Sequence, residues 1–214
     1  MAPKTTKGTC ALCTKEYTRA GMTKHLAKCL VEEKRATKGK TKPCLHLLVS
    51  TRHYALYWLH LQIDAKATFE RLDDFLRGIW LECCGHMSVF YVGRDEINMG
   101  RKVAEVLETG LTVNYDYDMG DTTSLQIKVM GHYAGKVVHG QPVKLLARNH
   151  LPEFPCDDCD KHPAKHICPF CQWDGEGWLC EACAAEHDCD EEEGFFLPVV
   201  NSPRTGVCAY ESDT

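Results

Sequence analysis

Residues 45–80 read LHLLVSTRHYALYWLHLQIDAKATFERLDDFLRGIW and change character near their middle. Residues 45–50 and 53–63 are rich in strand-forming residues, and apolar residues partly alternate with polar ones. This pattern predicts two strands joined by a turn around Arg52. Residues 67–80 then change to helical spacing. The apolar residues of this second part share one face of a predicted amphipathic helix: Phe69, Leu72, Phe75, Leu76 and Ile79.

The stretches that follow continue the same mixture of elements. Four further strands are predicted from their pattern, over residues 86–93, 111–118, 122–133 and 143–148. A short helix is predicted over residues 101–110, ended by Gly110. This order predicts an α+β fold, with a mixed or antiparallel sheet and helices packed on it, flanked by small zinc-binding modules.

Composition limits the class of protein. The chain has 214 residues, of which 44% are hydrophobic and 26% are charged, as in globular domains. No apolar run approaches the roughly 18 residues that a membrane span needs. The first residues, MAPKTTKGTC, lack the apolar core of a signal peptide. We therefore expect a cytoplasmic protein with no membrane contact.

Charge divides the chain into three segments. Residues 1–42 carry eleven Lys and Arg against three acids, whereas residues 43–150 are nearly balanced. Residues 151–214 carry three Lys and Arg against fifteen acids. We predict three matching domains: a basic finger with its linker, a central α+β domain, and an acidic zinc module with a tail for which no structure is predicted. The basic end suits phosphates, and the acidic end suits a protein partner.

Ten of the fourteen cysteines lie in Cys-x-x-Cys pairs or beside their histidine-bearing partners. This is metal-ligand spacing, so the thiols are expected to be reduced and to bind metal. The remaining cysteines, Cys44, Cys83, Cys84 and Cys208, have no partner at such spacing and are interpreted as core or exposed thiols.

The first ligand group lies in residues 10–29, CALCTKEYTRAGMTKHLAKC. Cys10 and Cys13 precede His25 and Cys29, and the latter two are four residues apart, on one face of a helix. The segment resembles the ββα zinc finger, with a cysteine as its fourth ligand. The basic residues expected to contact nucleic-acid phosphates are Lys15, Arg19, Lys24, Lys28, Lys34, Arg35, Lys38, Lys40 and Lys42. The alternative is a zinc-stabilised structural clip with solvated lysines.

The second ligand group contains four pairs at regular intervals: Cys156/Cys159, Cys168/Cys171, Cys180/Cys183 and His187/Cys189. It is similar to the cross-braced modules of the B-box and RING type. That resemblance implies that the first and third pairs bind one zinc ion and the second and fourth pairs another. A sequential arrangement, in which Cys168, Cys171, Cys180 and Cys183 share one ion, stays open. Protein docking is favoured over ubiquitin-ligase activity.

The central segment resembles the plasmid pRiA4b Orf-three-like family over about residues 43–160. The resemblance is carried by YWLHLQIDAKATFERLDDFLRGIWLECCGHMSVFYV, LTVNYDYDMGDTTSLQIKV and VKLLARNHLPEFPCDDC, and above all by Tyr117-Asp118-Met119-Gly120-Asp121, where the family has Phe in place of Met119. It implies an α+β domain linked to plasmids or mobile elements, with no established activity.

Asp116, Asp118 and Asp121, with His132, can also be interpreted as a divalent-metal site for phosphodiester chemistry. Strand alternation favours another interpretation, in which Tyr115 and Tyr117 point one way and the acids lie on a solvated face that leads into a turn. Phosphate-binding glycine loops, nucleophile elbows and His-Glu-x-x-His pairs are missing from the sequence.

The sequence thus predicts a non-enzymatic adaptor that binds three zinc ions. Nucleic acid would contact its basic end, and a protein partner its acidic end. Two alternatives remain: a metal-dependent nucleic-acid-processing enzyme that uses the aspartates, and a protein whose zinc modules are purely structural.

Overall fold

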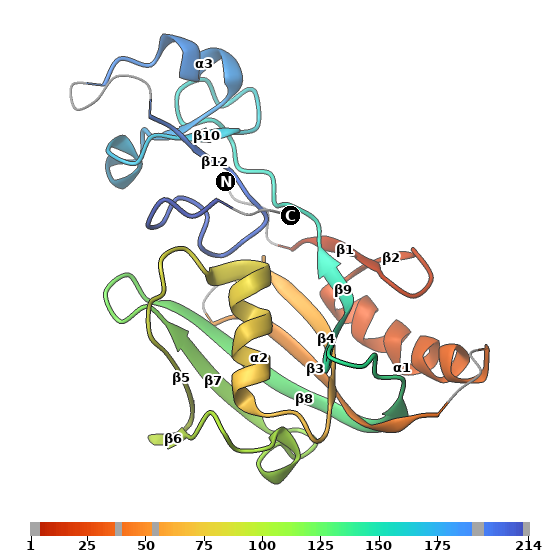
Figure 1. Cartoon of the computed structure of the whole chain (residues 1–214). Coiled ribbons are helices and arrows are strands. Elements are labelled where there is room, and N and C mark those ends of the chain that lie inside the picture. The colour runs from red at the N-terminus through yellow and green to blue at the C-terminus, as the bar shows by residue number, and fades with distance from the viewer. Residues whose placement is uncertain (1–4, 37–39, 53–55, 190–194, 212–214) are drawn as a thin grey trace.

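The structure is a computed structural model that describes residues 5–36, 40–52, 56–189 and 195–211, with residues 34–36 described for the backbone only. Within these residues, nine strands form one antiparallel sheet in the order β2-β1-β9-β4-β3-β8-β7-β5-β6 (Figure 1). The predicted α+β class is confirmed. The strands are β1 (Lys7–Cys10), β2 (Glu16–Thr18), β3 (Lys42–Thr51), β4 (Trp58–Asp64), β5 (Ser88–Val92), β6 (Asp95–Ile97), β7 (Thr112–Tyr117), β8 (Thr123–Gly135) and β9 (Val143–Asn149).

One face of the sheet is covered by the helix α2 (Phe69–Leu76), which continues into a π-helical turn, η1 (Arg77–Leu81) (Figure 1). The apolar face predicted for this helix is the face that the structure buries. Phe69, Leu72 and Leu76 are fully buried, and Phe75 and Ile79 pack at the edge of the same core. On the sheet side, alternate residues of β7 and β8 complete this core, including Tyr115, Tyr117, Leu125, Ile127 and Val129.

Part of the other face is covered by the helix α1 (Arg19–Ala36). Its residues Met22 and Leu26 are fully buried with Trp58 of β4 and Leu146 of β9. The hairpin before this helix extends the large sheet, because β1 pairs with β9. A side chain at Gly8 would overlap the Arg148 carbonyl group and the Trp58 ring, so glycine is required there. The N-terminal finger and the central segment therefore share one sheet.

The helix predicted over residues 101–110 was wrong, because the structure has only the 3-10 turn η2 (Val103–Glu105) there. The reason lies in the hydrogen bonds of the backbone. The Val103 N–H donates to the Ala67 carbonyl at 2.8 Å, and the Arg101 carbonyl accepts from the Phe69 N–H at 3.0 Å. A helix that starts at Arg101 would need this carbonyl to accept from the Glu105 N–H, which donates to the Lys102 carbonyl instead, at 3.0 Å.

The C-terminal module has a small sheet of its own, in the order β11-β10-β12. Its elements are β10 (His166–Ile167), η3 (Cys171–Asp174), β11 (Trp178–Leu179), α3 (Glu181–Glu186) and β12 (Leu197–Pro198). After β12 the chain returns to the large sheet. The Ser202 hydroxyl donates to the Trp80 carbonyl at 2.6 Å, and the Arg204 side chain is fully buried. The tail, for which sequence patterning predicted no structure, thus packs between the module and the large sheet (Figure 1).

No helix in the described residues is long and apolar enough to cross a membrane.

A pair of buried histidines lies in the middle of the sheet. His46 of β3 and His60 of β4 share a hydrogen bond of 2.8 Å between Nε2 and Nδ1. Burial lowers the pKa of His46 to about 4. Burial, followed by the charges of His46 and Arg19, lowers the pKa of His60 to about 3. Both rings are therefore neutral in the folded protein at neutral pH.

This pair is expected to make folding stability fall as the pH falls below about 6.5, the ordinary pKa of histidine. In that range the unfolded chain binds protons that the folded chain excludes. Between about pH 7 and about pH 5.5, the wild type should lose roughly 2 kcal/mol more unfolding free energy than the His46→Gln/His60→Gln variant. Urea unfolding at both pH values measures the difference, and parallel pH dependences would contradict it. Acid-induced metal loss affects both proteins and cancels in this comparison.

Candidate metal centres

The first cluster is built by the β1–β2 hairpin and α1. Cys10 and Cys13 lie at the hairpin turn, and His25 and Cys29 lie one turn apart on the helix that follows. Cys10 Sγ is 3.9 Å from Cys29 Sγ, and Cys13 Sγ is 3.2 Å from His25 Nε2. The four ligand atoms lie within 4.8 Å of one another. Tetrahedral zinc, with Zn–S near 2.3 Å, separates two sulfur ligands by about 3.8 Å.

The backbone of this hairpin favours thiolates. The Lys15 N–H points at the Cys13 sulfur and is the main cause of the lowered pKa of Cys13. Burial raises the pKa of Cys29 to about 12, so this thiol gives up its proton only to a strong positive charge. A bound Zn²⁺ supplies that charge, because it deprotonates the thiols that coordinate it. Tyr17 stacks on the His25 ring, with centroids 4.5 Å apart, and fixes its orientation.

Two clusters lie in the C-terminal module. Cys156, Cys159, Cys180 and Cys183 form one of them, and the other contains the remaining ligands of the module, Cys168, Cys171, His187 and Cys189. In the first, Cys159 Sγ is 3.9 Å from Cys180 Sγ. In the second, Cys189 Sγ is 3.8 Å from Cys168 Sγ and 3.6 Å from Cys171 Sγ. The pairs therefore alternate between the two clusters, which is the cross-braced grouping.

Backbone N–H groups also surround these sulfurs. Those of Lys161 and His162 lower the pKa of Cys159 to about 6. Burial raises the pKa of Cys168, but hydrogen bonds from the backbone N–H groups of Cys171 and Phe170, together with those from the His187 and Cys171 side chains, bring that pKa to about 7. In the same cluster, His187 Nε2 is buried and has no hydrogen-bond partner in the described residues. A metal ion coordinated at this nitrogen would satisfy it.

A fourth cluster joins two distant parts of the chain. Cys83, Cys84 and His86 follow η1, and Cys208 comes from the C-terminal tail. Spacing along the sequence does not reveal this cluster, because Cys84 and Cys208 are 124 residues apart. The local sequence signal was the run Cys-Cys-Gly-His, in which three ligand-type residues fall within four positions. Each of the four clusters could bind a metal ion, and the cysteine-rich donor sets favour zinc.

The aspartates considered for catalysis belong to none of the clusters found in the described residues. Asp116 is on the face of β7 opposite to Tyr115 and Tyr117, as alternation predicts. Asp118 differs from the prediction, because the strand ends before it and its φ of 65° turns the side chain inward. There Asp118 accepts a hydrogen bond from Arg204 at 2.9 Å, so it is a buried structural group.

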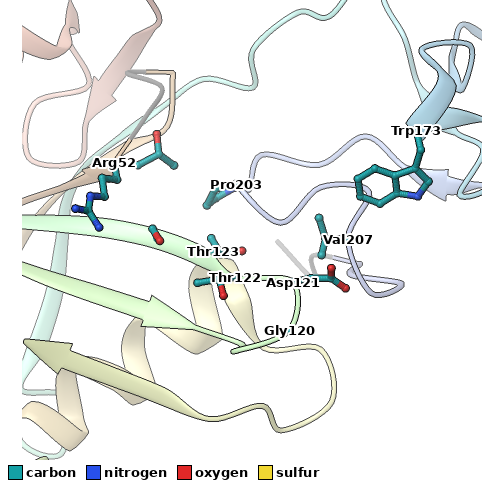
Figure 2. Close-up of a pocket in the computed structure, with 10 residues that line it drawn as sticks. Arg52, Gly120, Asp121, Thr122, Thr123, Trp173, Pro203 and Val207 are labelled. Carbon is teal, nitrogen blue, oxygen red and sulfur yellow. The ribbon is translucent and has the colours of Figure 1, made fainter.

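A groove opens beside Asp121, where the β7–β8 turn, the tail and the C-terminal module meet (Figure 2). Arg52 lies at one end and Trp173 of the module at the other, with Pro203 and Val207 of the tail between them. Asp121 is the one acidic side chain among the described residues that line this groove. Asp116 and Asp118 are not among the described residues that line it, so the three aspartates of the catalytic hypothesis do not converge on one site in this groove.

The predicted basic residues whose side chains the structure describes are exposed or partly exposed. Lys15, Lys24 and Lys28 are exposed and Arg19 is partly exposed, while His25 and Cys29 face inward. Lys40 and Lys42 are exposed beyond the helix. The side chains of Lys34 and Arg35, and the whole of Lys38, lie outside the described part of the chain.

The fold and the clusters define an α+β protein with four cysteine-rich sites that could each bind a metal ion. No protein-family model and no curated protein sequence matches the chain. A distant structural match is the "Crystal Structure of Protein of Unknown Function MM3350 from Methanosarcina mazei Go1", with 14% sequence identity and a TM-score of 0.41. The match covers 54% of this chain and 71% of that chain.

Proposed function

We propose that this protein is a non-enzymatic, zinc-binding adaptor that binds nucleic acid through its N-terminal face and a protein partner through its acidic module. The cytoplasm, where thiols stay reduced, is the compartment that suits such a protein. The resemblance to the plasmid pRiA4b Orf-three-like family agrees with a role beside mobile genetic elements. The observation that carries the nucleic-acid part is a cationic groove between α1 and the uncovered part of the large sheet.

The groove is lined by Arg19, Thr23 and Lys24 of α1 and by Gln126 and Lys128 of β8. The described residues that line it include three cations and no acid. Polar side chains line it on the sheet side because β8 alternates, with Leu125 and Ile127 buried under α2. Cations with hydrogen-bond donors beside them are the groups that bind phosphate backbones, largely without regard to sequence.

The finger is not a detachable arm. Deleting residues 1–42 would remove β1 and α1 and expose Trp58 and Leu146, so loss of binding by that variant would not distinguish a missing contact from misfolding. Charge reversal on the surface avoids this difficulty.

Reversing the three groove cations, in Arg19→Glu/Lys24→Glu/Lys128→Glu, is expected to abolish most binding to generic DNA and RNA. Each lost phosphate contact should reduce the slope of log affinity against log salt by about 0.7 to 0.9, so three should reduce it by about 2 to 3. Fluorescence anisotropy with labelled oligonucleotides, from about 50 to about 200 mM salt, measures both quantities.

The matched control is Lys66→Glu/Arg71→Glu/Lys102→Glu, which makes the same change in charge at exposed positions around α2. It should keep the wild-type salt slope. If both triple variants weaken binding equally, net charge and not the groove determines affinity. If the wild type does not bind, or binds independently of salt, the nucleic-acid function is wrong.

The acidic module supports the second part of the proposal. Glu176, Glu186 and Asp188 are exposed around a hollow between its two clusters, and Trp173 exposes 73% of its surface nearby. This surface repels phosphates and suits a basic protein. In the titrations above, Glu176→Gln/Glu186→Gln/Asp188→Asn should leave nucleic-acid affinity unchanged or raise it, and a fall would contradict this division of roles.

A further inference from the structure

We propose that Cys83, Cys84, His86 and Cys208 bind a fourth zinc ion, which fastens the C-terminal tail to the central sheet. The sulfur atoms have the separations that such a site needs. Cys84 Sγ is 3.6 Å from both Cys83 Sγ and Cys208 Sγ. His86 Nε2 is 3.0 Å from Cys84 Sγ and 3.4 Å from Cys208 Sγ. All four ligand atoms lie within 4.8 Å of one another.

These separations fit tetrahedral zinc and not a disulfide. A disulfide brings two sulfur atoms to about 2.05 Å, whereas two sulfur ligands of one zinc ion are about 3.8 Å apart. Gly85 allows three ligands to come from four consecutive residues, because its φ of 83° reverses the chain between Cys84 and His86. Three cysteines and one histidine are a common donor set for structural zinc.

The surroundings also fit the charge of such a site. Three thiolates and one Zn²⁺ leave one negative charge. Arg204, which is fully buried, points Nη2 at Cys83 Sγ from 3.6 Å. A guanidinium group in this position stabilises the thiolate charge. Arg204 also donates to Asp118 Oδ2 at 2.9 Å, so the same guanidinium group compensates the charge of the carboxylate that lies beside the cluster.

Because Cys208 lies in the C-terminal tail, the ion would connect this tail to the segment that follows η1. The tail that carries this residue contacts the zinc module on one side, where Gln172 Nε2 donates to the Gly206 carbonyl at 3.0 Å. On the other side it contacts η1 through Ser202 and the strand β8 of the central sheet through Arg204. A metal bond between Cys208 and the Cys83–His86 segment therefore fixes how the acidic module sits against the sheet. Cys84 and Cys208 are exposed, so this ion should exchange faster than the other three.

The test is the zinc content of the purified full-length chain, measured by mass spectrometry under native conditions. The wild type should bind four ions per chain, and Cys208→Ser should bind three. The matched control is Cys44→Ser, which removes a buried cysteine that belongs to no cluster in the described residues and should keep four ions. Hydrogen exchange should speed up at residues 199–211 of Cys208→Ser, while the three other clusters stay protected.

Three results would overturn the proposal. The first is a wild type that binds only three ions when zinc is supplied in excess. The second is a Cys208→Ser variant that keeps the wild-type number. The third is a Cys84–Cys208 disulfide, detected by peptide mapping without reduction in protein prepared under reducing conditions. A Cys208→His variant separates loss of a ligand from misfolding as the reason for a missing ion in Cys208→Ser. Histidine is also a zinc ligand, so this variant should bind four ions.

Discussion

Replacing Cys180 by serine is expected to remove one zinc ion and to open most of the C-terminal module, residues 156–189. The module cannot hold itself together without metal, because its apolar core is small: Leu179 is buried with Cys156 and Cys180, and few other apolar residues join them. Structural zinc contributes about 10 to 16 kcal/mol in small zinc-binding domains. Hydrogen exchange within the module should therefore accelerate by roughly 100-fold or more, while β3 and β8 keep their protection.

The pairing of ligands can be tested without unfolding the module. Among the four clusters of the described residues, one has sulfur ligands only, and it contains Cys156 and Cys180. Cadmium-113 substitution distinguishes this site from the sites with a histidine. Cys156→His should convert the all-sulfur signal to a mixed one, whereas Cys168→His should leave it in place. The reverse result would indicate the sequential arrangement, in which Cys168 belongs to the all-sulfur site.

The parts of the fold that sequence predicted well depend on local pattern. Alternation placed Tyr115 and Tyr117 in the core, and helical spacing identified the buried face of α2. The ligand pairs of the first three clusters are near in sequence, so spacing alone suggested them. In each case, residues within one element or one turn contain the signal.

The parts that sequence did not predict depend on contacts between distant segments. The 101–110 segment has a helical pattern, but its backbone groups bond to residues at the start of α2. Asp118 has the spacing of a solvated residue, but a positive φ and the arrival of Arg204 bury it. The cluster with Cys208 forms only because the tail returns to the central sheet. A repeating pattern of residues cannot encode these contacts, since the partners are 32 to 124 residues apart in the sequence.

Arg204→Leu is expected to lower the unfolding free energy of the central domain by about 3 to 5 kcal/mol, the usual result of removing one partner from a buried ion pair. The wild-type guanidinium is fully buried. It donates to the Asp121 carbonyl at 3.0 Å and to the Asp118 carboxylate at 2.9 Å, and it lies 5.0 Å from the centre of the Tyr117 ring. Leucine fills much of the space but leaves the carboxylate and the carbonyl without their donor.

Urea unfolding of the zinc-loaded chain measures this loss, with Arg94→Leu as an exposed control that should change stability by less than about 0.5 kcal/mol. Adding Asp118→Asn to Arg204→Leu should recover part of the loss, because it removes the charge left without a partner. If Arg204→Leu were as stable as the control, the tail would be a surface attachment and not part of the core. The expected loss of stability would show that Arg204, a residue of the C-terminal tail, belongs to the core of the central domain. The contacts of this tail then hold the acidic module against the sheet, in addition to the chain that connects the two.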